Sequence, residues 1–179
     1  MRLPTYSEDV LARAKKIKLL ICDVDGVLTD GRLFFTPEGQ ELKSFHARDG
    51  HGIKLLQRAG VEAAVISGRK SPAVALRMSS LGVQHVYQGC EDKLGPFQEL
   101  LELLQLTPEE VAFVGDDILD LPILRRVGLP ISVADGHFTI LETAQLITQN
   151  NGGAGAVREV CDLILMAKDA LESVIQSYH

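Results

Sequence analysis

Short apolar runs that end in acidic residues constrain the fold of this chain more than any other feature. The run Ile17–Cys22 is followed at once by Asp23 and Asp25, and the run Val111–Val114 is followed by Gly115-Asp116-Asp117. Segments with helical periodicity separate the runs, and this alternation is typical of a parallel sheet covered by helices on both faces. The sequence therefore predicts an α/β fold with a Rossmann-like, three-layer, doubly wound parallel sheet.

The same pattern places the elements along the chain. Strands are expected at residues 17–22, 61–66, 85–87, 111–114 and 130–133. Helices are expected at 52–59, after the Ser71-Pro72 cap, at 94–104 and at 156–177, and Thr107–Glu110 has capping-box spacing. The segment at about 31–46 instead alternates around Pro37-Glu38-Gly39, which predicts a projecting β-hairpin. Isolated hairpins are marginal in water and this one is apolar, so we expect it to pack on another subunit.

Size and composition narrow the class. The length of 179 residues predicts one domain over residues 1–179, with a Gly-rich tail and last helix at about 152–179. The net charge of -6 argues against broad nucleic-acid binding. Cys22 and Cys161 lie in apolar patterns and are expected to be buried thiols, which favours a reducing cytoplasm. The N-terminal segment lacks a signal-peptide pattern, and no apolar run approaches the roughly 18 residues of a membrane span.

Polar side chains collect at the carboxyl ends of the expected strands, where open α/β sheets place their sites. Taken singly, such aspartates are helix caps, a serine is a turn residue and a lysine is a solvated surface group. Their joint placement instead predicts one site. Its members are Asp23, Asp25, Ser67, Lys93, Asp116, Asp117 and Asp120.

These residues carry a family resemblance. The run Asp23-Val-Asp25-Gly-Val-Leu-Thr29 resembles the first motif of haloacid dehalogenase-type phosphatases, and Ser67, Lys93 and Gly115-Asp116-Asp117 match the other three in order. The resemblance covers essentially the whole chain. It implies that Asp23 is a nucleophile forming an aspartyl-phosphate, and that Asp25 is the general acid and base.

The resemblance also implies a Mg²⁺ site. Asp23, the backbone carbonyl of Asp25 and Asp116 would supply its oxygen ligands. Lys93 and Ser67 would stabilise the transferring phosphoryl group by charge and by hydrogen bonding. Asp117 and Asp120 are expected to orient Lys93 and the metal ligands rather than to bind the metal.

Finer matches point to one family. The segments between the motifs are too short for an inserted cap domain, so a capless type is expected. The runs Phe45–Gly50, Ser67–Arg69 and Gly152–Glu159 resemble the 3-deoxy-D-manno-octulosonate 8-phosphate phosphatases. That resemblance implies hydrolysis of this sugar-acid phosphate for lipopolysaccharide precursors, by a cytoplasmic homotetramer assembled through the hairpins. The expected substrate contacts are Thr29, Arg48, Asp49, Gly50, Gly68, Arg69 and Arg158.

Alternatives remain at several residues. Instead of binding substrate, Arg48 has the alternative of pairing with a carboxylate of the protein. The Gly-rich run has the alternative of being only a loop before the last helix. His46 and His51 are expected to be polar surface residues outside the site. The Gly-rich tail is expected to fold either over the site of its own chain or over the site of a neighbouring subunit.

Alternatives also remain for the function. The nearest is a phosphatase for a nine-carbon, sialic-acid-type 9-phosphate. A non-catalytic oligomerisation module is disfavoured because the nucleophile, acid, lysine and metal carboxylate are all present. A kinase-like transferase is disfavoured because there is no G-x-x-x-x-G-K-[ST] run, and a nucleic-acid module because basic patches and aromatic platforms are missing.

Overall fold

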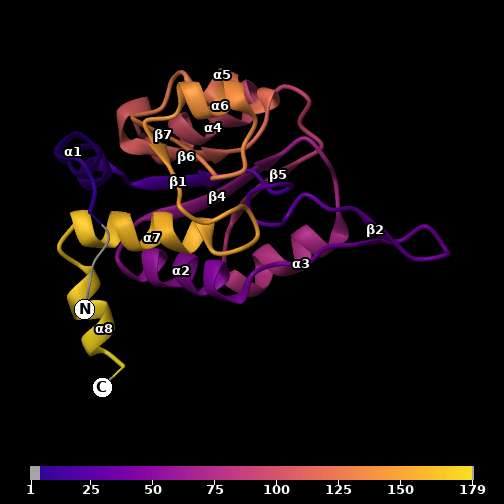
Figure 1. The fold of residues 1–179 in the computed structure, drawn as a ribbon, viewed down its shortest axis with the longest axis horizontal. Coiled ribbons are helices and arrows are strands. Elements are labelled where there is room, and N and C mark those ends of the chain that lie inside the picture. The colour runs from indigo at the N-terminus through magenta and orange to yellow at the C-terminus, as the bar shows by residue number, and fades with distance from the viewer. Residues whose placement is uncertain (1–4, 179) are drawn as a thin grey trace.

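A computed structural model describes residues 5–178; residues 1–4 and His179, at the ends of the expected domain, lie outside the described part. Six parallel strands form one sheet in the order β5-β4-β1-β6-β7-β8 (Figure 1). The strands are β1 Leu19–Cys22, β4 Glu62–Ser67, β5 His85–Gln88, β6 Val111–Gly115, β7 Leu129–Ser132 and β8 Leu146–Ile147. The doubly wound parallel sheet expected from the sequence is confirmed. The two-residue strand β8 was not predicted.

Helices cover both faces of the sheet. One face packs on α1 Glu8–Lys16, α2 Ala47–Arg58, α3 Pro72–Leu81 and α7 Ala156–Ala167. The other packs on α4 Leu94–Leu104, α5 Leu121–Leu124 and α6 Phe138–Thr143. Strand β1 is buried on both sides, because Leu20 and Cys22 join the first core while Leu19 and Ile21 join the second. Alternating side chains of one apolar strand therefore hold the two layers together.

Two helix predictions are wrong in their bounds. Helix α2 begins at Ala47, five residues before the expected start, and so includes Asp49 and Gly50. The single helix expected over 156–177 is two helices, α7 and α8 Leu171–Gln176. Between them Asp169 has a φ of 57°, a left-handed conformation that ends a right-handed helix. The 3₁₀ turn Pro108–Glu110 follows the predicted capping box, in which Glu110 Oε2 accepts from the Thr107 N–H at 3.0 Å.

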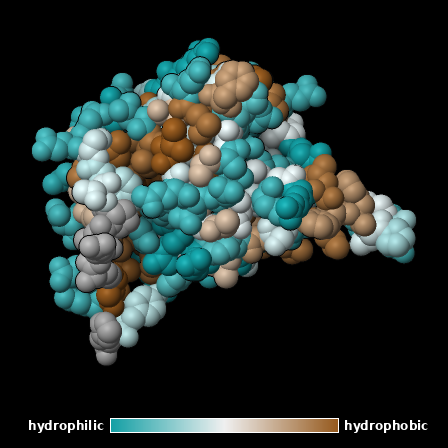
Figure 2. All heavy atoms as spheres, in the orientation of Figure 1, coloured by the Kyte–Doolittle hydropathy of each residue, from teal (hydrophilic) through white to brown (hydrophobic). Residues whose placement is uncertain are grey.

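The projecting hairpin is confirmed, although its strands are short. Strand β2 Phe34–Phe35 pairs antiparallel with β3 Glu41–Leu42, and Gly39 turns the chain with a φ of 83°. The arm extends from the end of the molecule near α3 (Figure 1). Its apolar side chains Leu33, Phe34, Phe35 and Leu42 are 45–59% exposed, and Figure 2 shows hydrophobic atoms gathered along it. Within residues 5–178, no helix is long and apolar enough to cross a bilayer.

Candidate active site

The site lies where the three central strands end. Strands β4 and β6 flank β1 in parallel register, with Cys22 opposite both Val65 and Val114. The residues that follow, Asp23, Ser67 and Asp116, are therefore delivered to the same edge of the sheet. The Asp23 N–H continues the ladder by donating to the Val114 carbonyl at 3.0 Å. Asp23 is 6% exposed and Ser67 is 2% exposed, so both lie at the floor of the site.

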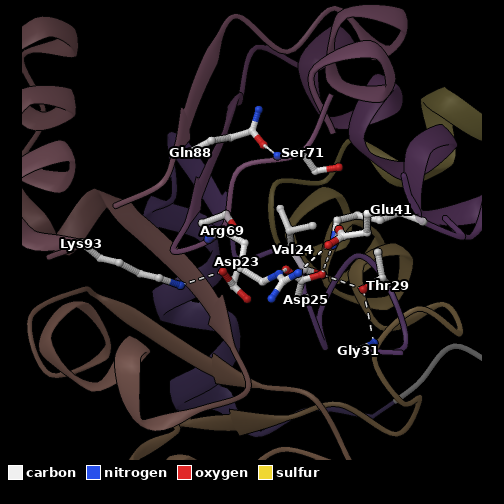
Figure 3. Close-up of polar contacts among 12 residues, drawn as sticks. Asp23, Val24, Asp25, Thr29, Gly31, Glu41, Arg69, Ser71, Gln88 and Lys93 are labelled. Atoms are coloured by element: carbon white, nitrogen blue, oxygen red, sulfur yellow. Dashed lines mark hydrogen bonds and ion pairs between the residues drawn. The ribbon is translucent and has the colours of Figure 1, made fainter. Parts of the chain in front are cut away.

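Lys93 joins two of the aspartates. It lies immediately before α4, and its Nζ donates to Oδ1 of Asp23 and to Oδ1 of Asp120, both at 2.6 Å. Figure 3 shows the side chain reaching across to Asp23. Burial lowers the pKa of the lysine, but the two carboxylates more than offset this and the net pKa is raised. The site therefore contains a fixed positive charge beside the candidate nucleophile.

Three carboxylates crowd together next to this lysine. Oxygens of Asp23, Asp116 and Asp120 lie within 4.8 Å of one another. Burial, partly opposed by Lys93 and reinforced by Asp120, raises the pKa of Asp23 to about 7. Burial and the neighbouring aspartates raise the pKa of Asp116 to about 8. Ionisation of these clustered, buried carboxyl groups is unfavourable without a nearby positive charge. Such a cluster of carboxylate oxygens is the donor set that a hard divalent cation prefers.

Asp120 organises the loop after β6. Its Oδ2 accepts from the backbone N–H of Asp116 at 2.9 Å and of Asp117 at 3.3 Å. Gly115 is required beside it, because a Cβ there would lie 2.6 Å from that oxygen. The Asp117 side chain is directed to the backbone, accepting from the Ile118 N–H at 2.7 Å. Asp120 thus touches both Lys93 and the segment that carries Asp116, while Asp117 caps a 3₁₀ turn.

A cavity of about 500 Å³ opens above this cluster. Besides the residues above, it is lined by Asp25, by Gly68 and Arg69 after β4, and by Glu91 and Leu119. The structure therefore brings together all seven residues expected at the strand ends, and adds two of the expected substrate contacts.

The other expected substrate contacts lie outside this cavity. Thr29 is buried, and its hydroxyl bridges the Val24 carbonyl and the Gly31 N–H at 3.3 and 3.2 Å (Figure 3). Asp49 is buried and accepts from the Arg158 N–H at 2.8 Å. The Arg158 guanidinium pairs with Asp162 at 2.8 Å.

The remaining residues of the α2 segment also point elsewhere. Gly50 packs on Arg77, where a Cβ would lie 2.2 Å from Nη2. Arg48 and His51 are exposed, and the His51 ring contacts the Tyr178 hydroxyl at 2.9 Å. His46 is half-buried at the start of α2. Thr29, Arg48, Asp49, Gly50 and Arg158 therefore do not line the cavity of their own chain.

The Gly-rich run packs on the first-motif loop of its own chain. The Gly153 N–H donates to the Val27 carbonyl at 2.9 Å, and the Gly152 N–H donates to Asp135 Oδ1 at 2.9 Å. A Cβ on Gly152 would lie 1.6 Å from the Gly26 carbonyl oxygen. Only glycine permits this approach, so the run supports the loop that carries Asp25.

The hairpin supplies two residues that sequence reasoning missed. Lys43 Nζ forms ion pairs with Asp25 Oδ1 and, at 2.6 Å, with Glu41 Oε1. Glu41 also pairs with Arg69, which lies beside Asp25 in Figure 3. The available signal was strand alternation, since Glu41 and Lys43 share the face opposite the apolar Leu42.

Comparisons with known proteins agree with this geometry. Residues 50–128 match the family model described as haloacid dehalogenase-like hydrolase. The chain is 49% identical to 3-deoxy-D-manno-octulosonate 8-phosphate phosphatase KdsC of Yersinia pestis, covering 93% of this chain and 89% of that one. The crystal structure of the phosphatase of that name from Yersinia pestis matches with a TM-score of 0.91 and 50% identity, over 92% of this chain and 89% of that one.

A further solved structure is similar at lower identity. The 3-deoxy-D-manno-octulosonate 8-phosphate phosphatase of Moraxella catarrhalis, in complex with a magnesium ion, a phosphate ion and KDO, has a TM-score of 0.95 and 38% identity. The match covers 97% of this chain and all of that one.

Proposed function

Because the chain belongs to the 3-deoxy-D-manno-octulosonate 8-phosphate phosphatases of the haloacid dehalogenase-like hydrolases, we propose that it hydrolyses this sugar-acid phosphate. The products are the free eight-carbon sugar acid and inorganic phosphate, for lipopolysaccharide precursor synthesis. The observation that carries the proposal is the contact of Lys93 with Asp23 and Asp120 beside Asp116, at the floor of the cavity.

The chain's own residues account for two displacements. The Asp23 carboxylate attacks phosphorus, and the bond from phosphorus to the sugar oxygen breaks as Asp25 donates a proton to that oxygen. Asp25 then takes a proton from water as the water attacks the aspartyl-phosphate, which releases phosphate and restores Asp23. Lys93 keeps positive charge beside the phosphoryl oxygens, and the Ser67 hydroxyl donates a hydrogen bond to them.

The carboxylate cluster fits a magnesium ion, and the Moraxella relative is in complex with one. Asp23 and Asp116, with the backbone carbonyl of Asp25, would hold Mg²⁺, which neutralises negative charge on the phosphoryl group. Asp120 sits between Lys93 and the Asp116 backbone and so orients both. Gly26 leaves room for Asp116, since a Cβ there would lie 2.1 Å from Asp116 Oδ2.

We propose that residues lining the cavity select the substrate. Gly68 and Arg69 line the cavity of their own chain and are the proposed contacts for the sugar acid. Asp49 and Arg158 join α2 to the start of α7, and Thr29 holds the first-motif loop. Any contact of Arg48 or Arg158 with substrate is therefore proposed to be with a neighbouring subunit's ligand, whereas the buried Asp49 and Gly50 are proposed to support α2 instead.

We also propose a cytoplasmic homotetramer assembled through the hairpins. The support is the exposure of the apolar side chains Phe34, Phe35 and Leu42 on the arm, together with free cysteines at positions 22, 90 and 161. Phe35→Ser combined with Leu42→Ser should yield smaller species by light scattering, while the single exposed change Leu76→Ser should not. An unchanged mass for the double variant would refute assembly through these apolar side chains of the hairpin.

The function is tested by phosphate release from a panel of substrates with Mg²⁺ and with a chelator. The panel holds octulosonate 8-phosphate, nine-carbon acid 9-phosphates, hexose phosphates and an aryl phosphate. A Mg²⁺-dependent preference for the octulosonate is expected. Preference for a nine-carbon acid would keep the chemistry and replace the substrate, and no hydrolysis at all would support a non-catalytic module.

A further inference from the structure

The hairpin contributes a closed ring of alternating charges to the site. Lys43 pairs with Asp25 and Glu41, Glu41 pairs with Arg69, and Arg69 Nε lies 3.6 Å from Asp25 Oδ2. The side chain of Lys43 is 1% exposed, although it belongs to an arm whose apolar residues are largely exposed. A buried ammonium is tolerated because two carboxylates surround it.

The two oxygens of Asp25 have different surroundings. Oδ1 is held by Lys43, whereas Oδ2 is buried and accepts no hydrogen bond from the described part of the chain. A carboxyl group that is fixed through one oxygen presents the other in a defined direction. Asp25 also lines the cavity, next to the candidate nucleophile Asp23. Oδ2, which accepts no hydrogen bond and has only the ion pair with Arg69 Nε at 3.6 Å, is thus the oxygen left to exchange a proton with a ligand.

From these contacts we propose that Lys43 is a positioning residue, which holds Asp25 through Oδ1 so that Oδ2 carries the proton in both displacements. Glu41 supports Lys43 from the opposite side and is the second carboxylate that its charge requires. In the first step the proton passes from Oδ2 to the sugar oxygen as its bond to phosphorus breaks. In the second step a proton passes from the attacking water to Oδ2. This inference rests on the proposed phosphatase mechanism.

The effect of Lys43 on the rate should depend on the leaving group. A sugar alkoxide needs a proton to depart, whereas nitrophenolate departs as the anion and needs little help. Misplacing Asp25 should therefore slow phosphoryl transfer from the sugar-acid phosphate much more than transfer from 4-nitrophenyl phosphate. A role of Lys43 in merely tying the arm to the domain would affect both substrates equally.

The experiment compares wild-type protein, Lys43→Met and Lys43→Arg in single-turnover release of the two leaving groups, with Mg²⁺ present. Lys43→Met should lose on the order of 100-fold with the sugar-acid phosphate and less than about threefold with nitrophenyl phosphate. Lys43→Arg, which keeps the charge, should recover part of the loss. Arg32→Met, which removes an exposed cation near the same arm, should match wild type.

Equal losses with both substrates, or no loss with the sugar-acid phosphate, would overturn the positioning role. Should Lys43→Met fail to fold by circular dichroism, Glu41→Gln tests the same role, because it removes the second carboxylate that holds Lys43 and so loosens the hold of Lys43 on Asp25. If the wild-type protein does not hydrolyse octulosonate 8-phosphate, the proposed substrate is wrong. The leaving-group comparison then still tests Lys43 with whichever alkyl phosphate the wild type hydrolyses.

Discussion

Lys93 Nζ lies 2.6 Å from Oδ1 of Asp23, although the two residues are 70 positions apart in the chain. Asp23 follows strand β1 and Lys93 immediately precedes α4 on one face of the sheet, so the contact depends on the whole α/β framework. The lysine is 3% exposed and shares its ammonium with Asp120. A nucleophilic carboxylate held against a fixed cation is suited to approach a phosphate dianion.

Lys93→Met should lower kcat by at least about 100-fold, the scale seen when one charge-stabilising group is removed from an active site. KM should change less, because the lysine acts mainly on charge that develops as phosphorus is attacked. Steady-state kinetics with saturating Mg²⁺ measures both constants, and the exposed Lys54→Met serves as the matched control. A kcat within about threefold of wild type would remove Lys93 from the mechanism.

The stability of the metal-free protein should fall as pH rises from about 4 to about 8. Asp23 and Asp116 have native pKa values of about 7 and about 8, above the ordinary value of 3.8, so the folded state binds these protons more tightly than the unfolded chain. Their contribution is complete below the ordinary value and is lost as pH rises through the native values. Thermal unfolding in a chelator should show a lower midpoint at the alkaline end.

Mg²⁺ should restore this loss, because it binds the ionised carboxylates and so stabilises the folded state most at alkaline pH. Asp116→Asn should flatten the chelator profile and weaken the Mg²⁺ effect, whereas the exposed Asp169→Asn should leave both unchanged. A midpoint that does not respond to Mg²⁺ at any pH would contradict the proposed cation site.

Gly152→Ala should destabilise the protein and reduce its activity together. The added Cβ would lie 1.6 Å from the Gly26 carbonyl oxygen, so the first-motif loop that carries Asp25 must move. A cost of at least about 1–3 kcal/mol is expected for such overpacking. Gly95→Ala is the matched control, because its Cβ meets nothing within 4 Å in helix α4 and alanine favours helices. Equal melting temperatures and rates for the two variants would refute this role of Gly152.

The sequence predicted the centre of the site because strand ends are visible as apolar runs followed by aspartates. The start of α2 was missed because Gly50, which precedes the expected start at Gly52, has low helix propensity and resembles a loop. In the structure both glycines serve packing, since Cβ atoms there would press on Arg77 and on Arg158. Close contacts between helices depend on tertiary packing, which a local sequence pattern does not predict.

The sequence also did not predict what the polar face of the hairpin contacts. Alternation places Glu41 and Lys43 on one face, but it does not say whether that face meets solvent or Asp25. The apolar periodicity of residues 156–177 continues on both sides of Asp169, so this pattern does not indicate the break before α8. In the structure the backbone of Asp169 has a φ of 57°, which ends the helix there.

The central claim is that Asp23 accepts the phosphoryl group, and trapping that intermediate tests it most directly. Asp25→Asn, which should accept phosphate but lack a base to activate water, is mixed with 4-nitrophenyl phosphate and Mg²⁺, quenched and reduced with borohydride. Mass spectrometry of the peptide containing residue 23 should show homoserine in place of Asp23, and Asp23→Asn should show no reduction at that position and no turnover. Nitrophenolate release with residue 23 unmodified, or turnover by Asp23→Asn, would contradict the account.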